Sequence, residues 1–134
     1  MGSELAKLRG EAPRGPLPFG EGQAVRDAQE KIRDGVRSGA LHNAHDIAEG
    51  GLAVALAECC AAGGVGARVL LPDGLELFGE APGRGFIVSG RKETLAGLRI
   101  IGRVGGAELE IQGRLKVAVS EIRAARESGL AGFV

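Results

Sequence analysis

Glycine is the feature that most constrains the fold of this chain, because it occupies 24 of the 134 positions. That is about 18% of the residues, against a usual share near 7%, and it predicts many tight turns and close backbone approaches. No Gly-X-Y period is present, which excludes a collagen-like helix, and the 44% of hydrophobic residues argues against wholesale disorder. Trp and Tyr are absent and only four Phe are present, so we expect a small core of aliphatic side chains.

The charges of the chain exclude some classes of ligand. Lys and Arg number 17 and Asp and Glu number 17, with no basic cluster and few aromatic residues, so nucleic acid is not an expected partner. No run approaches the roughly twenty apolar residues that span a bilayer, and no signal-peptide pattern opens the sequence, so we expect no membrane association. Cys59 and Cys60 are adjacent and are expected to be unpaired core thiols. Free thiols are typical of a reducing compartment, which predicts a cytoplasmic location.

Hydrophobic periodicity predicts an α/β or α+β domain in which helices cover a mixed β-sheet. Residues 1–22 include the Pro- and Gly-rich stretch 10–22 and are interpreted as a linker or the remnant of a preceding domain, which assigns the folded domain to residues 23–134. Apolar residues spaced by three and four predict a helix from Gln23 that ends at Gly39, and a second helix at 52–62. The other predicted elements are strands at 41–46, 67–71, 85–89, 99–104 and 108–112, one helical turn at 75–78, two helical turns at 91–98, and a terminal helix capped by Ser120 and ended by Gly129.

The most informative stretch is residues 44–58, AHDIAEGGLAVALAE, which combines a strand end, an acidic loop and two glycines that open a helix. The free N–H groups at such a helix start attract anions, as in many phosphate sites. Asp46 and Glu49 would repel a bare phosphate, so the loop either needs a divalent cation or uses its carboxylates to cap the helix. His45 fits either a hydrogen-bonded structural histidine or a general base. From the residues alone these alternatives remain open.

Three segments, in this order, resemble the last domain of phosphoribosylformylglycinamidine synthase. His45–Glu58, HDIAEGGLAVALAE, resembles the HD-x-x-[DE]-GGLAVALAE stretch of that family; Leu77–Arg84, LFGEAPGR, is similar to its LFGES-x-GR loop, and Ile101–Gly106 to its IG-x-VGG turn. Gly2–Glu4 also resembles the end of the domain that precedes it in the family. The resemblance implies the C-terminal fold of the aminoimidazole ribonucleotide synthase-related superfamily. The family has a longer helix between Ser89 and Gly102 than this chain can form.

The resemblance implies an ATP-dependent C–N ligase of purine biosynthesis, which converts formylglycinamide ribonucleotide and glutamine-derived ammonia into the amidine. The full-length enzyme uses ATP and magnesium, but its catalytic and metal-binding groups lie mostly in earlier domains. No catalytic residue, no metal ligand and no certain cofactor are therefore expected in this chain. The implied partners are the preceding domains of the same enzyme, its glutaminase subunit and its small accessory subunit. Self-association is also expected, through the aliphatic strands that begin at residues 67, 85 and 99.

The candidate ligand-binding residues belong to the two loops that carry the resemblance: His45, Asp46, Glu49, Gly50, Gly51, Glu80 and Arg84. Arg84 is equally compatible with an ion pair to Glu80 that fixes the loop. Ala-Pro follows Glu80 where the family has Ser-Gln, which removes two hydrogen-bonding side chains. The first hypothesis is a scaffold domain without activity of its own. The alternative is a stand-alone module that binds a nucleotide or phosphate at Gly50 and Gly51, and a third hypothesis is a divergent enzyme that uses His45 and Asp46 as acid and base.

Overall fold

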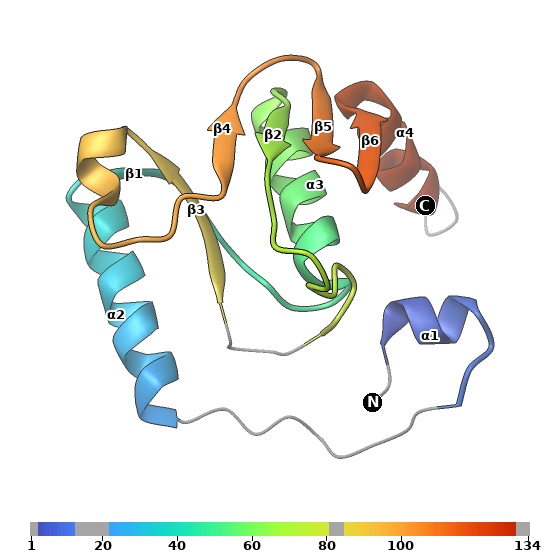
Figure 1. Cartoon of the computed structure of the whole chain (residues 1–134), viewed down its shortest axis with the longest axis horizontal. Coiled ribbons are helices and arrows are strands. Elements are labelled where there is room, and N and C mark those ends of the chain that lie inside the picture. Colours follow the sequence, from blue (N-terminus) through green and yellow to red (C-terminus); the bar gives the residue numbers. More distant parts are fainter. Residues whose placement is uncertain (1–2, 13–21, 81–84, 131–134) are drawn as a thin grey trace. The chain divides into compact units, whose positions relative to one another are not determined.

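The chain forms two compact units in a computed structural model that describes residues 3–12, 22–80 and 85–130 (Figure 1). The first unit comprises residues 1–55 and 76–98, and the second comprises residues 56–75 and 99–134. The first five residues of helix α3 (Gly51–Gly63) belong to the first unit, and the rest of the helix belongs to the second. Within the described residues, no helix is both long and apolar enough to cross a membrane.

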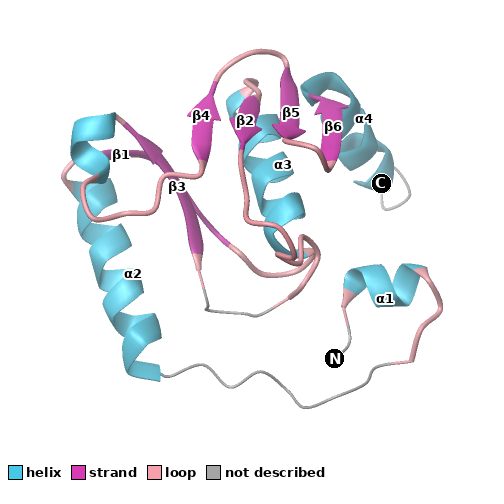
Figure 2. Cartoon of the chain, viewed as in Figure 1, coloured by secondary structure: helices cyan, strands magenta, loops and turns pink. Residues whose placement is uncertain are grey.

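The first unit contains a two-stranded antiparallel sheet of β1 (Leu41–Asp46) and β3 (Phe86–Gly90) (Figure 2). Helix α2 (Gly22–Arg37) packs against β1. The contact is close because Gly35 has no side chain, and a Cβ there would lie 2.7 Å from Leu41 Cδ1. The unit also holds helix α1 (Glu4–Leu8) and the short 3₁₀ helix η1 (Lys92–Leu95). Neither α1 nor α2 has a fully buried residue.

The second unit contains a four-stranded mixed sheet in the order β4-β2-β5-β6, drawn side by side in Figure 1. Its strands are β2 (Ala67–Val69), β4 (Gly102–Val104), β5 (Glu108–Ile111) and β6 (Leu115–Ala118), and helix α4 (Val119–Leu130) follows β6. Strands β2 and β5 are parallel, and the other neighbours are antiparallel. This arrangement confirms the predicted fold class of helices with mixed sheet.

The alternation of side chains along β5 places the core of the second unit on one face of its sheet. Leu109 and Ile111 are fully buried, and Val69 of β2 is almost so. On the opposite face, Arg68 Nε donates a hydrogen bond of 3.0 Å to Glu110 Oε2. The remaining buried apolar side chains of this unit come from α3, from β2 and the segment after it, and from α4: Leu56, Cys60, Ala61, Ala67, Leu71 and Val119.

Six predicted elements are confirmed, and each of their boundaries lies within two residues of the prediction. They are the helices at 23–39 and 52–62 and the strands at 41–46, 67–71, 85–89 and 108–112. Two helical predictions are wrong. The segment 75–78 is a loop with a bend at Leu77 and Phe78, in which the carbonyl of buried Leu77 accepts the Ala53 N–H. Only η1 forms in the segment 91–98, where Thr94 Oγ1 donates to the carbonyls of Ala40 and Arg91 and fixes a single turn.

Three further features of the structure differ from the sequence prediction. The strand expected at 99–104 begins only at Gly102. Helix α4 begins at Val119, so Ser120 lies inside it and does not cap it; Glu121 Oε2 instead accepts the Ala118 N–H at 3.0 Å. Strand β6 was not predicted, because four residues between a turn and a helix are too short for a period of two to be recognised. The predicted linker at 10–22 lies mostly outside the described residues, and the division at residue 22 remains a prediction.

Candidate functional site

A tight turn of two buried glycines connects β1 to α3. Gly50 and Gly51 have φ values of +74° and +69°, in the left-handed region that side chains disfavour. The Gly51 N–H donates to the Ala48 carbonyl at 3.1 Å and closes the turn. The sequence HDIAEGG therefore produces the tight entry into a helix that its glycine pair predicts.

The loop Leu77–Glu80 occupies the space that Gly51 leaves open by lacking a side chain. The Ala53 N–H, in the first turn of α3, donates to the Leu77 carbonyl at 2.9 Å. A Cβ on Gly51 would lie 2.8 Å from the Leu77 carbonyl oxygen and 2.9 Å from that of Gly79, closer than real side chains approach. The close backbone approach at Gly51 is therefore made by another part of the same chain.

Glu80 connects this loop to the glycine turn through its carboxylate. Its Oε1 accepts the Gly50 N–H at 2.9 Å and the Glu4 N–H, the first of α1, at 2.7 Å. Hydrogen bonds to a carboxylate are shorter and stronger than those between neutral groups. Gly50, Gly51 and Ala53 thus donate to acceptors within the chain, and the carboxylate of Glu80 takes the position in which an anion was predicted.

The predicted acid–base residues, His45 and Asp46, lie at the end of β1. His45, on β1, pairs across the sheet with Ile87, and its Nδ1 lies 2.7 Å from the Asp46 carbonyl oxygen and 3.6 Å from Asp46 Oδ1. This contact joins chain neighbours and leaves the His45 ring partly exposed. Asp46 and Glu49 are exposed, and Arg84 lies outside the described residues. The structure therefore brings Gly50, Gly51 and Glu80 together, and their ligand-binding role remains a prediction.

Helix α1 lies within residues 1–22, which the sequence analysis interprets as a linker or the remnant of a preceding domain. Ser3 Oγ accepts the Ala6 N–H at 3.1 Å and caps the helix, and Lys7 forms an ion pair with Glu4. The hydrogen bond that Lys7 Nζ donates to the Glu4 carboxylate, together with the Glu4 charge, raises the pKa of Lys7, with smaller contributions from Glu49 and Glu80. The signal that predicts α1 is a serine followed by the helix-forming residues ELAKL.

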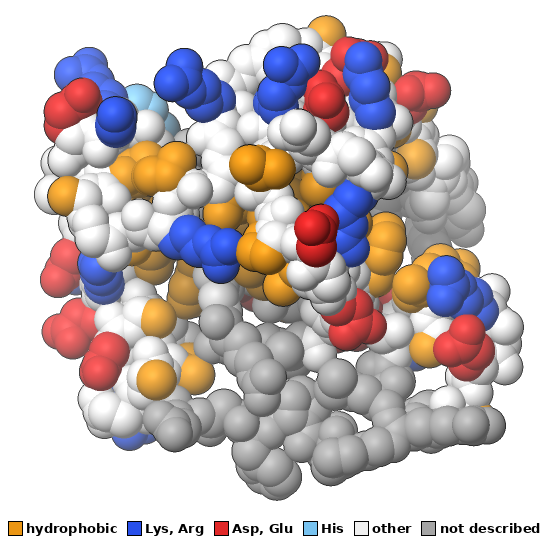
Figure 3. All heavy atoms as spheres, in the orientation of Figure 1, with side chains coloured by type: hydrophobic (Ala, Val, Ile, Leu, Met, Phe, Trp, Pro, Cys, Tyr) orange, Lys and Arg blue, Asp and Glu red, His pale blue; other side chains and the backbone are white. Residues whose placement is uncertain are grey.

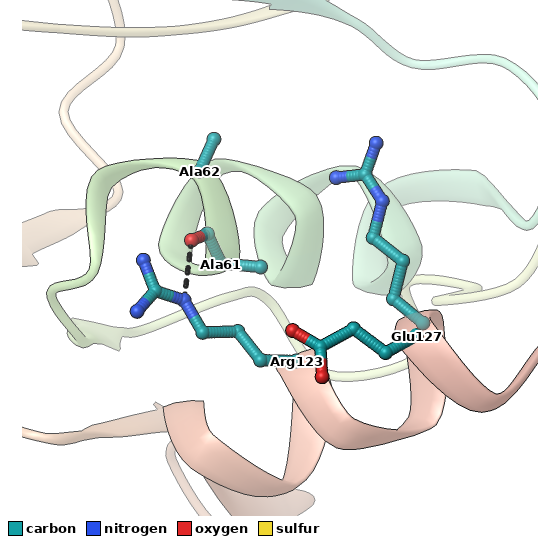
Figure 4. Close-up of a pocket in the computed structure, with 5 residues that line it drawn as sticks. Ala61, Ala62, Arg123 and Glu127 are labelled. Atoms are coloured by element: carbon teal, nitrogen blue, oxygen red, sulfur yellow. Dashed lines mark hydrogen bonds between the residues drawn. The ribbon is translucent and has the colours of Figure 1, made fainter.

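The second unit has an open hollow of about 390 Å³ between α3 and α4, shown in Figure 4. Arg123 Nε donates to the Ala61 carbonyl at 2.8 Å and thereby satisfies an acceptor in the last turn of α3. The hollow contains none of the predicted site residues; its lining is Ala61, Ala62, Arg123, Arg126 and Glu127.

Nearby in α3, burial and then the neighbouring Cys59 raise the pKa of the Cys60 thiol, as suits a core thiol rather than a nucleophile. Among the residues placed by the structure, no three or more His, Cys, Asp or Glu are grouped so as to hold a metal.

Comparison with known proteins matches residues 3–125 to the family model of the AIR synthase related protein, C-terminal domain. The chain belongs to this family. Similar relatives are named phosphoribosylformylglycinamidine synthase subunit PurL. The protein of Frankia casuarinae is 42% identical over 130 residues, which cover 83% of this chain and 17% of the relative. The protein of an Anaeromyxobacter species is 42% identical over 76% of this chain and 16% of its own length. The protein of Brucella ovis is 34% identical over 90% of this chain and 18% of its own length.

Membership of the AIR synthase related C-terminal domain family confirms the resemblance carried by the three motifs. Two of these motifs, HDIAEGG and LFGE, are the segments that pack on each other at the glycine turn. These two family motifs therefore have a structural role in this chain, because their residues pack on and hydrogen-bond to each other. The chain spans less than a fifth of the length of these relatives.

Proposed function

We propose that this chain is the C-terminal domain of a phosphoribosylformylglycinamidine synthase, the ATP-dependent ligase that amidates formylglycinamide ribonucleotide in purine biosynthesis. The observation that carries the proposal is the similarity to subunits of that name over 83% of the chain. In this proposal the complete enzyme binds ATP and magnesium and uses ammonia derived from glutamine. Its preceding domains, a glutaminase subunit and a small accessory subunit are the partners of the domain.

Within that enzyme we assign the domain the role of a scaffold. The support is physical: the backbone donors of the glycine turn are used by Glu80, Leu77 and Ala48. A phosphate at Gly50 would have to displace the Glu80 carboxylate, which carries the same sign of charge. The alternative function, a module that holds a nucleotide at this turn, is accordingly not favoured.

A chimera tests whether the domain serves a synthase. The segment of the Frankia casuarinae relative that matches this chain is replaced by residues 3–125, and the purified enzyme is assayed for amidine formation from formylglycinamide ribonucleotide, ATP and ammonia. We expect the chimera to retain activity and to lose it when Gly51→Val is introduced. A soluble, folded chimera without activity would contradict the proposal.

The isolated chain tests the scaffold role separately. We expect no turnover by the 134-residue protein with the same substrates, because the proposal places the reacting groups in other domains. Turnover that His45→Ala abolishes would instead establish the hypothesis of a divergent enzyme with His45 as its acid or base.

A further inference from the structure

Two backbone N–H groups from distant segments converge on a single oxygen in the first unit. Glu80 Oε1 accepts one hydrogen bond from Glu4, 76 positions away, and one from Gly50, 30 positions away. A carboxylate oxygen has two lone pairs and can accept both bonds. The N-terminal helix, the glycine turn and the LFGE loop therefore meet at one atom.

Helix α1 is too short to be stable by itself. Helices shorter than about 12 residues are marginal in water, and α1 has five. None of its residues is fully buried, and Leu8 is 84% exposed. Leu5 and Ala6 are partly buried. The directed contacts of α1 include the hydrogen bond from Glu4 to Glu80 and the attraction of Lys7 to Glu49 and Glu80.

We propose that the binding of α1 to the rest of the first unit and the order of the Gly50–Gly51 turn are coupled, and that Glu80 provides the coupling because it is bonded to both. Fixing a glutamate side chain costs rotamer entropy, and here two hydrogen bonds share that one cost. If the Glu4 N–H is lost, the Gly50 N–H alone must hold Glu80 in place, so its own bond opens more often. Because such coupling is reciprocal, disorder of the glycine turn also releases α1. Displacement of residues 3–8 therefore loosens the turn at the start of α3.

The structure offers a substitution that removes the Glu4 N–H and leaves the helix intact. Glu4 is the first residue of α1, a position that proline favours, and Ser3 has the extended backbone (φ −137°, ψ 160°) that a residue before proline requires. Glu4→Pro therefore deletes the donor to Glu80. It also removes the ion pair with Lys7, so Glu4→Gln is the matched control, which loses the charge and keeps the N–H.

Amide hydrogen exchange in the full chain provides the measurement. The Gly50 N–H is the reporter, and the Ala53 N–H, which donates to the Leu77 carbonyl, is the internal reference for general unfolding. We expect Glu4→Pro to speed exchange at Gly50 about tenfold relative to Glu4→Gln, with a change below about twofold at Ala53. Glu80→Ala should speed exchange at both Gly50 and Glu4, whereas Glu76→Ala, in the same loop, should speed neither.

Two results would overturn the proposal. Equal exchange at Gly50 in Glu4→Pro and Glu4→Gln would mean that the turn is ordered independently of α1. Equal acceleration at Gly50 and Ala53 in Glu4→Pro would mean that the whole unit is loosened, with no specific coupling through Glu80.

Discussion

The buried positions of the second unit are mainly aliphatic side chains, whereas those around the glycine turn of the first unit are mostly glycine and alanine. Leu109 and Ile111 are fully buried in the mixed sheet. At the turn, the buried residues are Gly50, Gly51, Ala53 and Leu77, and the directed interactions are hydrogen bonds to Glu80 and Leu77. The apolar area removed from water is therefore much smaller at the turn than in the sheet.

The stabilities of the two regions are therefore expected to be sensitive to opposite kinds of substitution. Burial contributes roughly 25 cal/mol per Å² of apolar surface, so the sheet should be sensitive to lost volume. The turn depends on backbone conformation and close approach, so it should be sensitive to added atoms. Two of the three family motifs lie at the turn, and the third, Ile101–Gly106, includes strand β4 of the second unit.

The largest effect is expected from Gly51→Val. Positive φ at a side chain costs about 1 to 3 kcal/mol, and the new Cβ would meet the Leu77 and Gly79 carbonyls. We expect a loss of about 4 kcal/mol in the free energy of unfolding, measured by chemical denaturation and circular dichroism, since the chain has no Trp or Tyr. Gly39→Val is the control, because Gly39 has φ +72° and nothing within 4 Å. Equal losses for the two variants would show that the LFGE loop does not fill the turn.

The next effect is expected from Leu109→Ala in the sheet. This change removes a fully buried side chain and should cost about 3 kcal/mol. Leu70→Ala provides the contrast, since Leu70 is 65% exposed and should change stability by less than about 0.5 kcal/mol. Figure 3 shows other apolar side chains at the surface among charged ones. If Leu70→Ala were the more costly substitution, the assignment of the core to the Leu109 face would be wrong.

A smaller effect is expected at the start of α4. Glu121→Ala removes the acceptor of the Ala118 N–H, and loss of a helix cap costs about 1 kcal/mol. Glu127→Ala, on the same helix, should be close to neutral. The difference in melting temperature between the two variants measures the cap, and no difference would assign the start of α4 to packing alone.

The smallest effect is a pH dependence that comes from Cys60. Burial raises the pKa of this thiol, so above about pH 8 the unfolded chain releases a proton that the folded chain retains. The unfolded state then binds fewer protons, and the free energy of unfolding falls as the pH rises. Cys60→Ala should flatten this fall, while Cys59→Ala should leave most of it. The raised pKa values of Lys7 and Lys116 act at higher pH and are common to both variants.

Much of the fold follows from local sequence patterns, and the bonding of the site does not. The apolar repeat of residues 23–39 predicts α2, and the alternation at Leu109 and Ile111 predicts β5. Strand β5 buries one face, whereas the apolar face of α2, at Val25, Ala28 and Ile32, is only partly buried. The glycine pair predicts a tight turn. The acceptor of the Gly50 N–H is Glu80, which lies 30 residues further along the chain. A local hydrophobic period cannot predict a contact over that separation. The same limit explains why Leu75–Phe78 was expected to be helical, since its buried leucine packs on a distant helix start.

The most direct test of the account is a titration of the backbone amides of Gly50, Gly51 and Ala53 with magnesium ATP, ADP and inorganic phosphate, followed by NMR. We predict no saturable shift at these amides, because their donors are held by the chain itself. A saturable shift at Gly50 and Gly51 that becomes stronger in Glu80→Ala would contradict the account. It would show that the turn is an anion site and that Glu80 competes with the ligand for it.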